Sequence, residues 1–196
     1  IERYLQLAAQ DNMWIVQPST PANHFHMLRT QAYKRPRKPL IAFTPKQLLR
    51  LSAASSHIEE FTSGGFQPII GDTTITDPAS VTRVLLCSGR LYYDLAKERE
   101  HRGDTSTAII RLEQLYPLPE AELAEVLAQY PNASVTWAQD EPRNQGAWPH
   151  LALNLFPSLG RPVRVVSRPE SATTAAGRAS LHKEQAATLI AQAFAG

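Results

Sequence analysis

Between residues 81 and 196 the sequence repeats one pattern four times: a short, strand-like apolar run, followed by a stretch with helical character. Parallel strands need a long crossover between them, and a helix is the usual one. The alternation therefore predicts a three-layer α/β domain with a mainly parallel sheet covered by helices. The apolar runs are residues 84–87, 108–112, 135–138 and 163–166, and the helical stretches are residues 91–102, 120–129, 147–155 and 181–194.

The first part of the chain, residues 1–51, also alternates strand and helix signals. Residues 12–17 form a β-rich apolar run, and Ser19-Thr20-Pro21 gives a cap residue followed by proline, which is a typical helix start. The following residues predict an amphipathic helix that ends at a basic, proline-containing stretch, after which residues 40–43 predict another strand. The apolar residues of that helix, at three- and four-residue spacing, are Ala22, Phe25, Leu28 and Ala32, with Met27 beside them.

Residues 52–80 lose this periodicity, because Ser, Gly, Asp and Thr interrupt every apolar run. We interpret the segment as a linker between residues 1–51, the end of one α/β domain, and residues 81–196, a complete second domain. A structureless segment of this length is long for an internal loop, so we expect it to cross between domains or to lie across a surface.

Composition excludes several classes of function. The formal net charge is +2 with both signs well mixed, so the chain lacks the basic surface of a general nucleic-acid binder. The single Cys87 excludes an intrachain disulfide and a multi-cysteine metal site, and no apolar run approaches the ~20 residues of a membrane span. We expect a reducing, cytoplasmic setting with no nucleic-acid or membrane partner. Because the chain opens on Ile1 within an apparent helix, we also expect it to be part of a longer polypeptide.

Nine segments distributed over nearly the whole chain resemble the E1 component of 2-oxoglutarate dehydrogenase. None is a catalytic motif by itself, but their order and spacing together are specific. They are residues 2–7 (ERYLQL), 18–22 (PSTPA), 25–29 (FHMLR), 38–41 (KPLI), 44–46 (TPK), 86–95 (LCSGRLYYDL), 111–117 (RLEQLYP), 139–148 (QDEPRNQGAW) and 160–162 (GRP). Two further strings, at residues 11–14 and 22–25, are similar to the actinobacterial branch of the family, in which an acyltransferase-like domain is fused to E1.

The resemblance implies a transketolase-like enzyme of three α/β domains. Residues 1–51 would be the end of its pyrimidine-binding domain and residues 81–196 its C-terminal domain. It further implies a homodimer that decarboxylates 2-oxoglutarate on thiamine diphosphate with Mg²⁺ and passes the succinyl unit to lipoamide of the E2 acyltransferase. The cofactor motif and the family's substrate-binding histidine belong upstream of Ile1, so no catalytic or metal-binding residue is carried over to this chain.

Two basic elements are candidates for binding an effector. Lys34, Arg35, Arg37 and Lys38 follow a predicted helix C-terminus, where they would act either as a solvated cap or as a phosphate clamp stiffened by two prolines. Ser88-Gly89-Arg90 lies between a strand and a helix, where free N–H groups favour an anion, although a Ser cap and a Gly turn explain the same residues. The resemblance implies regulation by nucleotide-type effectors, including acetyl-CoA, and we predict that the two elements form one phosphate site.

Asp140 and Glu141 follow another predicted strand. We interpret them as part of a structural or dimer-contact loop and not as an acid/base pair, because adjacent side chains of an extended segment point apart and Arg143 can neutralise one of them. Trp148 and Arg143 are the candidate interface residues in this loop.

Three further features have mainly structural interpretations. His24 and His26 diverge by about 200° on a helix, so at most one faces inward and the two cannot chelate one metal. Cys87 is interpreted as an inert core thiol, and residues 168–178 as a surface loop that could contact other domains or a second subunit.

Two function classes remain open at this point. One is the enzyme, in which this portion supplies dimer contacts and an effector site. The other is a non-catalytic interaction module of a related 2-oxoacid dehydrogenase or carboligase. The upstream sequence would separate them, because the cofactor motif is either present or absent there.

Overall fold

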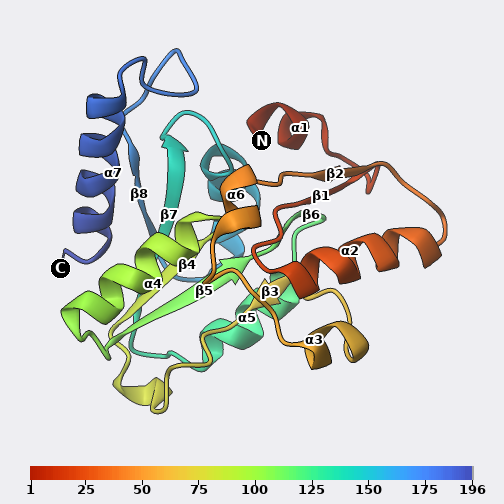
Figure 1. The fold of residues 1–196 in the computed structure, drawn as a ribbon, viewed down its shortest axis with the longest axis horizontal. Coiled ribbons are helices and arrows are strands. Elements are labelled where there is room, and N and C mark those ends of the chain that lie inside the picture. The colour runs from red at the N-terminus through yellow and green to blue at the C-terminus, as the bar shows by residue number, and fades with distance from the viewer. Residues whose placement is uncertain (196) are drawn as a thin grey trace.

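The computed structural model describes residues 1–195, and its largest element is the predicted sheet (Figure 1). Five strands lie in the order β3-β5-β4-β7-β8, all parallel except β3, which is antiparallel to β5. The strands are β3 (Ile69–Ile70), β4 (Arg83–Cys87), β5 (Thr107–Leu112), β7 (Ser134–Pro142) and β8 (Val163–Arg168). The helices that follow are α4 (Leu91–Arg102), α5 (Glu120–Ala128), α6 (Trp148–Asn154) with the short η3 (Phe156–Leu159), and α7 (Ala179–Ala193).

Helices cover both faces of this sheet, because alternate residues of each strand point to opposite sides. Val84 and Leu86 of β4 join one apolar cluster, which contains Leu123 of α5 and Leu151 of α6. Their neighbours Leu85 and Cys87 join a second cluster, which α4 and α7 complete. The three-layer α/β architecture expected from the alternating pattern is therefore confirmed.

A second, three-stranded sheet has the order β2-β1-β6 and joins the two parts of the chain. β1 (Trp14–Val16) pairs in parallel with β2 (Leu40–Ala42), as the apolar runs predict. β6 (Gln114–Tyr116) pairs antiparallel with β1 although it follows β5 after a single residue. The sequence pattern did not separate β6 from the strand before it, because the change of sheet occurs at one position, Glu113.

The helix α2 (Pro21–Tyr33) begins one residue before the predicted stretch of residues 22–33 and ends with it, but it does not have the predicted orientation. Its buried residues are Ala22, Asn23, His26 and Met27, whereas Phe25 and Leu28 are 42% and 52% exposed. The apolar spacing was misleading because two polar residues, Asn23 and His26, make buried hydrogen bonds on the inner face. The chain begins with a short helix, α1 (Glu2–Leu7).

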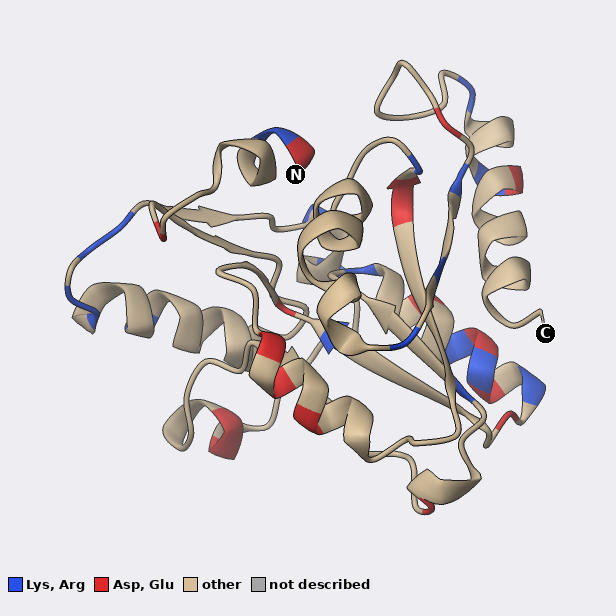
Figure 2. Cartoon of the chain, turned by 180° about the vertical axis from the view of Figure 1, so that it is seen from behind, with Lys and Arg blue, Asp and Glu red and all other residues tan. Residues whose placement is uncertain are grey.

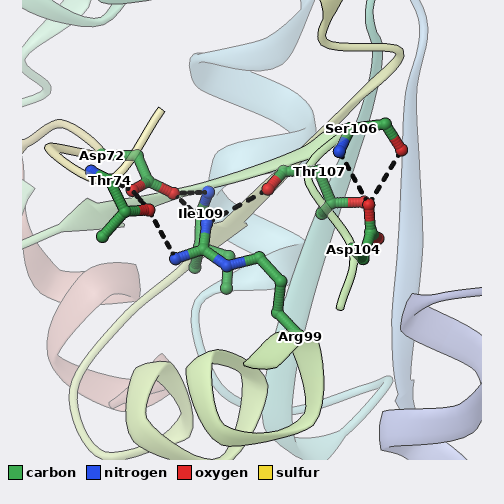
Figure 3. Close-up of polar contacts among 7 residues, drawn as sticks. All are labelled: Asp72, Thr74, Arg99, Asp104, Ser106, Thr107 and Ile109. Carbon is green, nitrogen blue, oxygen red and sulfur yellow. Dashed lines mark hydrogen bonds and ion pairs between the residues drawn. The ribbon is translucent and has the colours of Figure 1, made fainter. Parts of the chain in front are cut away.

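Residues 52–80 contain only short elements after η1 (Lys46–Arg50): α3 (Ile58–Thr62), β3 and η2 (Pro78–Ser80). The buried carboxylate of Asp72 connects this segment to the large sheet, because it forms an ion pair with Arg99 of α4 (Figure 3). The carboxylate also accepts hydrogen bonds from the Thr74 hydroxyl at 2.6 Å and from the Ile109 N–H at 2.7 Å. Burial raises the pKa of Asp72, but these hydrogen bonds outweigh burial and hold the pKa below its ordinary value.

Cys87 is a core thiol, as the sequence predicts. Cys87 is fully buried, and burial raises its pKa to about 12, so the thiol is protonated at neutral pH and a poor nucleophile. Within the described residues, every helix is too short or too polar to span a bilayer.

Candidate functional site

The carboxyl ends of β4, β7 and β8 carry a network of four charged side chains. Arg90 pairs with Asp94 at 2.7 Å and with Asp140 at 3.2 Å. Arg168, which is only 5% exposed, binds the other oxygen of Asp140 at 2.7 Å and also donates to the Asp140 carbonyl at 2.7 Å. Burial raises the pKa of Asp140, but Arg168 and Arg90 outweigh burial, so the pKa lies below its ordinary value.

This network corrects two expectations. Arg143 does not neutralise the Asp140–Glu141 pair, because its side chain is exposed and Arg90 and Arg168 take that role. Arg168 is not a surface-loop residue, because it is the last residue of β8 and points inward to the carboxylate. The loop itself begins after Arg168 and runs to α7, with Ser171 accepting a hydrogen bond from Gln145 at 2.8 Å.

The basic stretch Lys34–Lys38 forms the connection between α2 and β2 and appears as the blue segment at the far end of α2 in Figure 2. Arg35 and Arg37 both donate to the Ala32 carbonyl, at 3.3 Å and 3.0 Å, so they cap the last turn of the helix. Lys34 Nζ lies 5.4 Å from the centre of the Trp14 ring. Among the described residues, no carboxylate forms a salt bridge with any of the four cations.

A hollow of about 290 Å³ lies beside this basic stretch. Its wall includes Lys34, Lys38, Trp14 and Gln31, whose amide donates to the Lys38 carbonyl, and also the acidic Asp11. Two lysines against one aspartate leave a net positive lining, which together with the Trp14 ring suits an anionic ligand that carries a flat ring.

The two basic elements do not form a single site within the chain. The start of α2 lies next to the Ser88–Arg90 turn, because the Tyr93 hydroxyl of α4 donates to the Ser19 carbonyl at 2.7 Å. The helix then runs for 13 residues, or about 20 Å at ~1.5 Å per residue, before Lys34. The prediction that the Lys34–Lys38 stretch and the Ser88–Arg90 turn form one phosphate site is therefore wrong for a single copy of the chain. The sequence shows that each element lies at a helix end, but it does not show the distance between them.

A buried polar cluster at the start of α2 was not predicted. Glu113 is fully buried and accepts hydrogen bonds from the Ser19 N–H at 2.7 Å and from the Asn23 amide at 3.0 Å. Asn23 also exchanges two hydrogen bonds with the backbone of Gln67. Burial raises the pKa of Glu113, and the hydrogen bonds from Ser19 and Asn23 only partly offset this effect. The cluster ties α2, the approach to β3 and the β5–β6 junction together.

Two of the other candidate residues, Trp148 and His26, have placements that favour intrachain roles. Trp148 is partly buried, packs against the large apolar cluster and lies 5.9 Å from the Phe156 ring. His26 faces inward with Nε2 at 2.8 Å from the Glu60 carbonyl, while His24 is only half-buried.

Comparison with known proteins places the chain in a family. Residues 55–194 match the family described as 2-oxoglutarate dehydrogenase C-terminal, and residues 1–52 match the transketolase pyrimidine-binding domain. The chain is 48% identical over 99% of its length to the 2-oxoglutarate dehydrogenase E1/E2 component of Corynebacterium glutamicum and 45% identical over 99% to the E1 component of Azotobacter vinelandii. It is 41% identical over its full length to the multifunctional 2-oxoglutarate metabolism enzyme of Mycobacterium sp. strain JLS.

The chain spans 16% of the length of the Corynebacterium and Mycobacterium relatives and 21% of the Azotobacter one. The matches cover both parts of the chain without a large gap, in agreement with the resemblance of the nine sequence segments. The chain therefore belongs to the 2-oxoglutarate dehydrogenase family and contains its C-terminal domain.

Proposed function

We propose that this chain works as part of a thiamine-diphosphate-dependent 2-oxoglutarate dehydrogenase E1. That enzyme would decarboxylate 2-oxoglutarate and pass the succinyl unit to lipoamide on E2, as a homodimer in the cytoplasm. The observation that carries the proposal is the 41–48% identity, over essentially the whole chain, to relatives named as 2-oxoglutarate dehydrogenase E1 or E1/E2 components and as a multifunctional 2-oxoglutarate metabolism enzyme.

The described residues fit a supporting role better than a catalytic one. Among residues 1–195, no group of three or more His, Cys, Asp or Glu side chains could hold a metal ion, and the family resemblance assigns the cofactor motif to another part of a longer chain. We therefore derive no catalytic step from them and propose that thiamine diphosphate and Mg²⁺ are held by other parts of a longer chain.

We propose two tasks for this portion. The exposed face of α2, with Phe25 and Leu28, and the exposed Arg143 would contribute to contacts between subunits. The cations Lys34, Arg35, Arg37 and Lys38 would bind the phosphates of acetyl-CoA or a nucleotide effector. The absence of a described carboxylate partner for these four cations supports the second task, since each retains donors for an external anion.

The activity is tested by decarboxylation assays of the intact enzyme with 2-oxoglutarate, pyruvate and 2-oxoadipate. We expect a clear preference for 2-oxoglutarate. The 196-residue chain alone should be inactive, and calorimetry with thiamine diphosphate and Mg²⁺ should detect no micromolar binding. Absence of decarboxylation by the intact enzyme with all three acids would favour a non-catalytic interaction module instead.

A further inference from the structure

A small cavity lies at the carboxyl ends of β4 and β7, separate from the basic stretch at the end of α2. Its volume is about 130 Å³, and its wall includes Gln17, Ser88, Arg90, Gln139, Asp140 and Glu141. An engineered cavity of ~150 Å³ can hold a benzene molecule, so this one has room for a ligand of only a few heavy atoms. A nucleotide or a coenzyme A derivative cannot enter it as a whole.

Two polar side chains on this wall lack a hydrogen-bond partner in the described part of the chain. The Ser88 hydroxyl oxygen is inaccessible to solvent and has no partner. Gln17 is only 9% exposed, and no described hydrogen bond involves its side-chain amide. A buried polar group without a partner costs roughly 1–3 kcal/mol, so the buried Ser88 hydroxyl favours a partner supplied from outside the described residues, and the Gln17 amide beside it has donors free for the same partner.

The Gln17 amide lies against the Gly89 turn. Gly89 has φ of +60°, and a Cβ atom on it would lie 2.6 Å from Gln17 Nε2. Glycine is therefore needed at this turn both for the positive φ and for the close approach of the amide. The arrangement brings the amide and the Ser88 hydroxyl to the N-terminus of α4, a 12-residue helix whose first N–H groups favour a negative charge.

The position in the sheet also favours a ligand. The chain passes from β4 to β5 on one side and later returns to β7 on the other side of β4. This reversal of strand order is a topological switch point, where the crevice outside the strand ends is the usual place for ligands in open α/β sheets.

The carboxylates on the opposite wall do not prevent an anion from binding. Asp140 is neutralised by Arg90 and Arg168. Burial raises the pKa of Glu141, and the neighbouring charge of Asp140 adds to the effect, which favours the neutral carboxyl form. A hydrogen bond with its own backbone lowers the pKa of Glu141 and partly offsets burial, whereas the Glu2 carboxylate raises it further.

We propose that this cavity binds a small oxyanion, a short-chain carboxylate or inorganic phosphate, through the Gln17 amide, the Ser88 hydroxyl and the first turn of α4. Arg90 stays in its ion pairs and shapes the wall. The site is independent of effector binding at the Lys34–Lys38 stretch.

The proposal is tested by titrating the intact enzyme, isotope-labelled at Gln, Leu and Tyr, with acetate and, separately, with inorganic phosphate while recording amide resonances. We expect saturable shifts of the Gln17 side-chain amide and of the backbone amides of Leu91 and Tyr92. The anion that produces them at lower concentration identifies the ligand class. Both Ser88→Ala and Gln17→Leu should weaken binding about tenfold, since each removes one hydrogen bond to a charged group, worth roughly 1.5–3 kcal/mol.

Two controls keep the outcome clear. Ser88→Ala removes a buried hydroxyl that has no partner, so its melting temperature should be equal to or above that of the wild type. Arg35→Ala, at the distant basic stretch, should leave the shifts of Gln17 unchanged. Absence of shifts at Gln17 with both anions, or equal affinities in the wild type and both cavity variants, would overturn the proposal.

Discussion

The two groups of cations in this molecule differ in whether the fold already uses them. Arg90 and Arg168 are bound to Asp94 and Asp140, and Arg168 is almost completely buried. The cations between Lys34 and Lys38 are mostly exposed, and within residues 1–195 their described polar contacts are with backbone carbonyls and the Trp14 ring. The comparison teaches that a basic residue after a strand or helix indicates an anion site only where no carboxylate of the same fold reaches it.

The sharpest difference between the two groups should appear in stability. Asp140→Ala leaves Arg168 buried without its carboxylate, and breaking a buried pair costs roughly 3–5 kcal/mol. The Asp140 side chain is 35% exposed, so solvent offsets part of this, and we expect a loss of about 2–3 kcal/mol in the free energy of unfolding. Urea denaturation measures it. Arg164→Ala, which removes an exposed charge from β8, is the matched control and should change stability by less than ~0.5 kcal/mol.

Trp148 extends the comparison to an apolar side chain that was predicted as an interface anchor. Its contacts with Phe156 and the large apolar cluster lead us to expect that Trp148→Ala lowers the free energy of unfolding by about 2 kcal/mol, less than a fully buried Trp would. Leu153→Ala on the same helix, at a position 79% exposed, should have little effect. Sedimentation of the intact enzyme then separates the roles: an unchanged assembly with a lower melting temperature supports packing, whereas dissociation supports the interface.

Protonation of Asp72 at low pH should lower the free energy of unfolding. Its pKa is lowered in the folded state, so its contribution to stability is fully present above the ordinary aspartate pKa of ~3.9 and is lost as the pH falls through the lowered value. The Asp72→Asn variant should be less stable at neutral pH and should show a smaller loss between about pH 5 and pH 2. If the free energy of unfolding fell equally with pH in the variant and the wild type, the ionisation of Asp72 would not contribute to stability.

The smallest stability effect is expected in the basic stretch. Arg35→Ala removes hydrogen bonds to two exposed carbonyls, those of Ala32 and Lys34, and should change the free energy of unfolding by no more than ~0.5 kcal/mol. A loss as large as that of Asp140→Ala would mean that the helix cap is a structural element of the fold.

The sequence predicted the regular parts of this fold well because they depend on local periodicity. The strands β4, β5 and β8 and the helices α2 and α4 lie at or within two residues of the expected positions. The sequence did not reveal the inner face of α2, since that face depends on the buried contact of Asn23 with Glu113, 90 positions away. It did not reveal β6 because the chain changes sheet at the single residue Glu113.

The candidate site was less predictable than the fold. Helix-end chemistry identified Ser88 and the basic stretch as places for an anion, but no local pattern could show that Arg90 is paired with Asp140, 50 positions away. Gln17 gave no signal in the sequence, because its relevance comes only from its contact with Gly89.

The central claim, that the unpaired cations at the end of α2 bind the effector while Arg90 has a structural role, is tested most directly by activation of the intact enzyme. Activity is measured against acetyl-CoA concentration for the wild type, Arg35→Ala and Arg90→Ala. We predict that Arg35→Ala raises the concentration needed for half-activation about tenfold, as expected for the loss of a charge-assisted contact, and keeps basal activity. Arg90→Ala should keep the wild-type activation midpoint. An unchanged midpoint in Arg35→Ala together with a raised midpoint in Arg90→Ala would contradict the account.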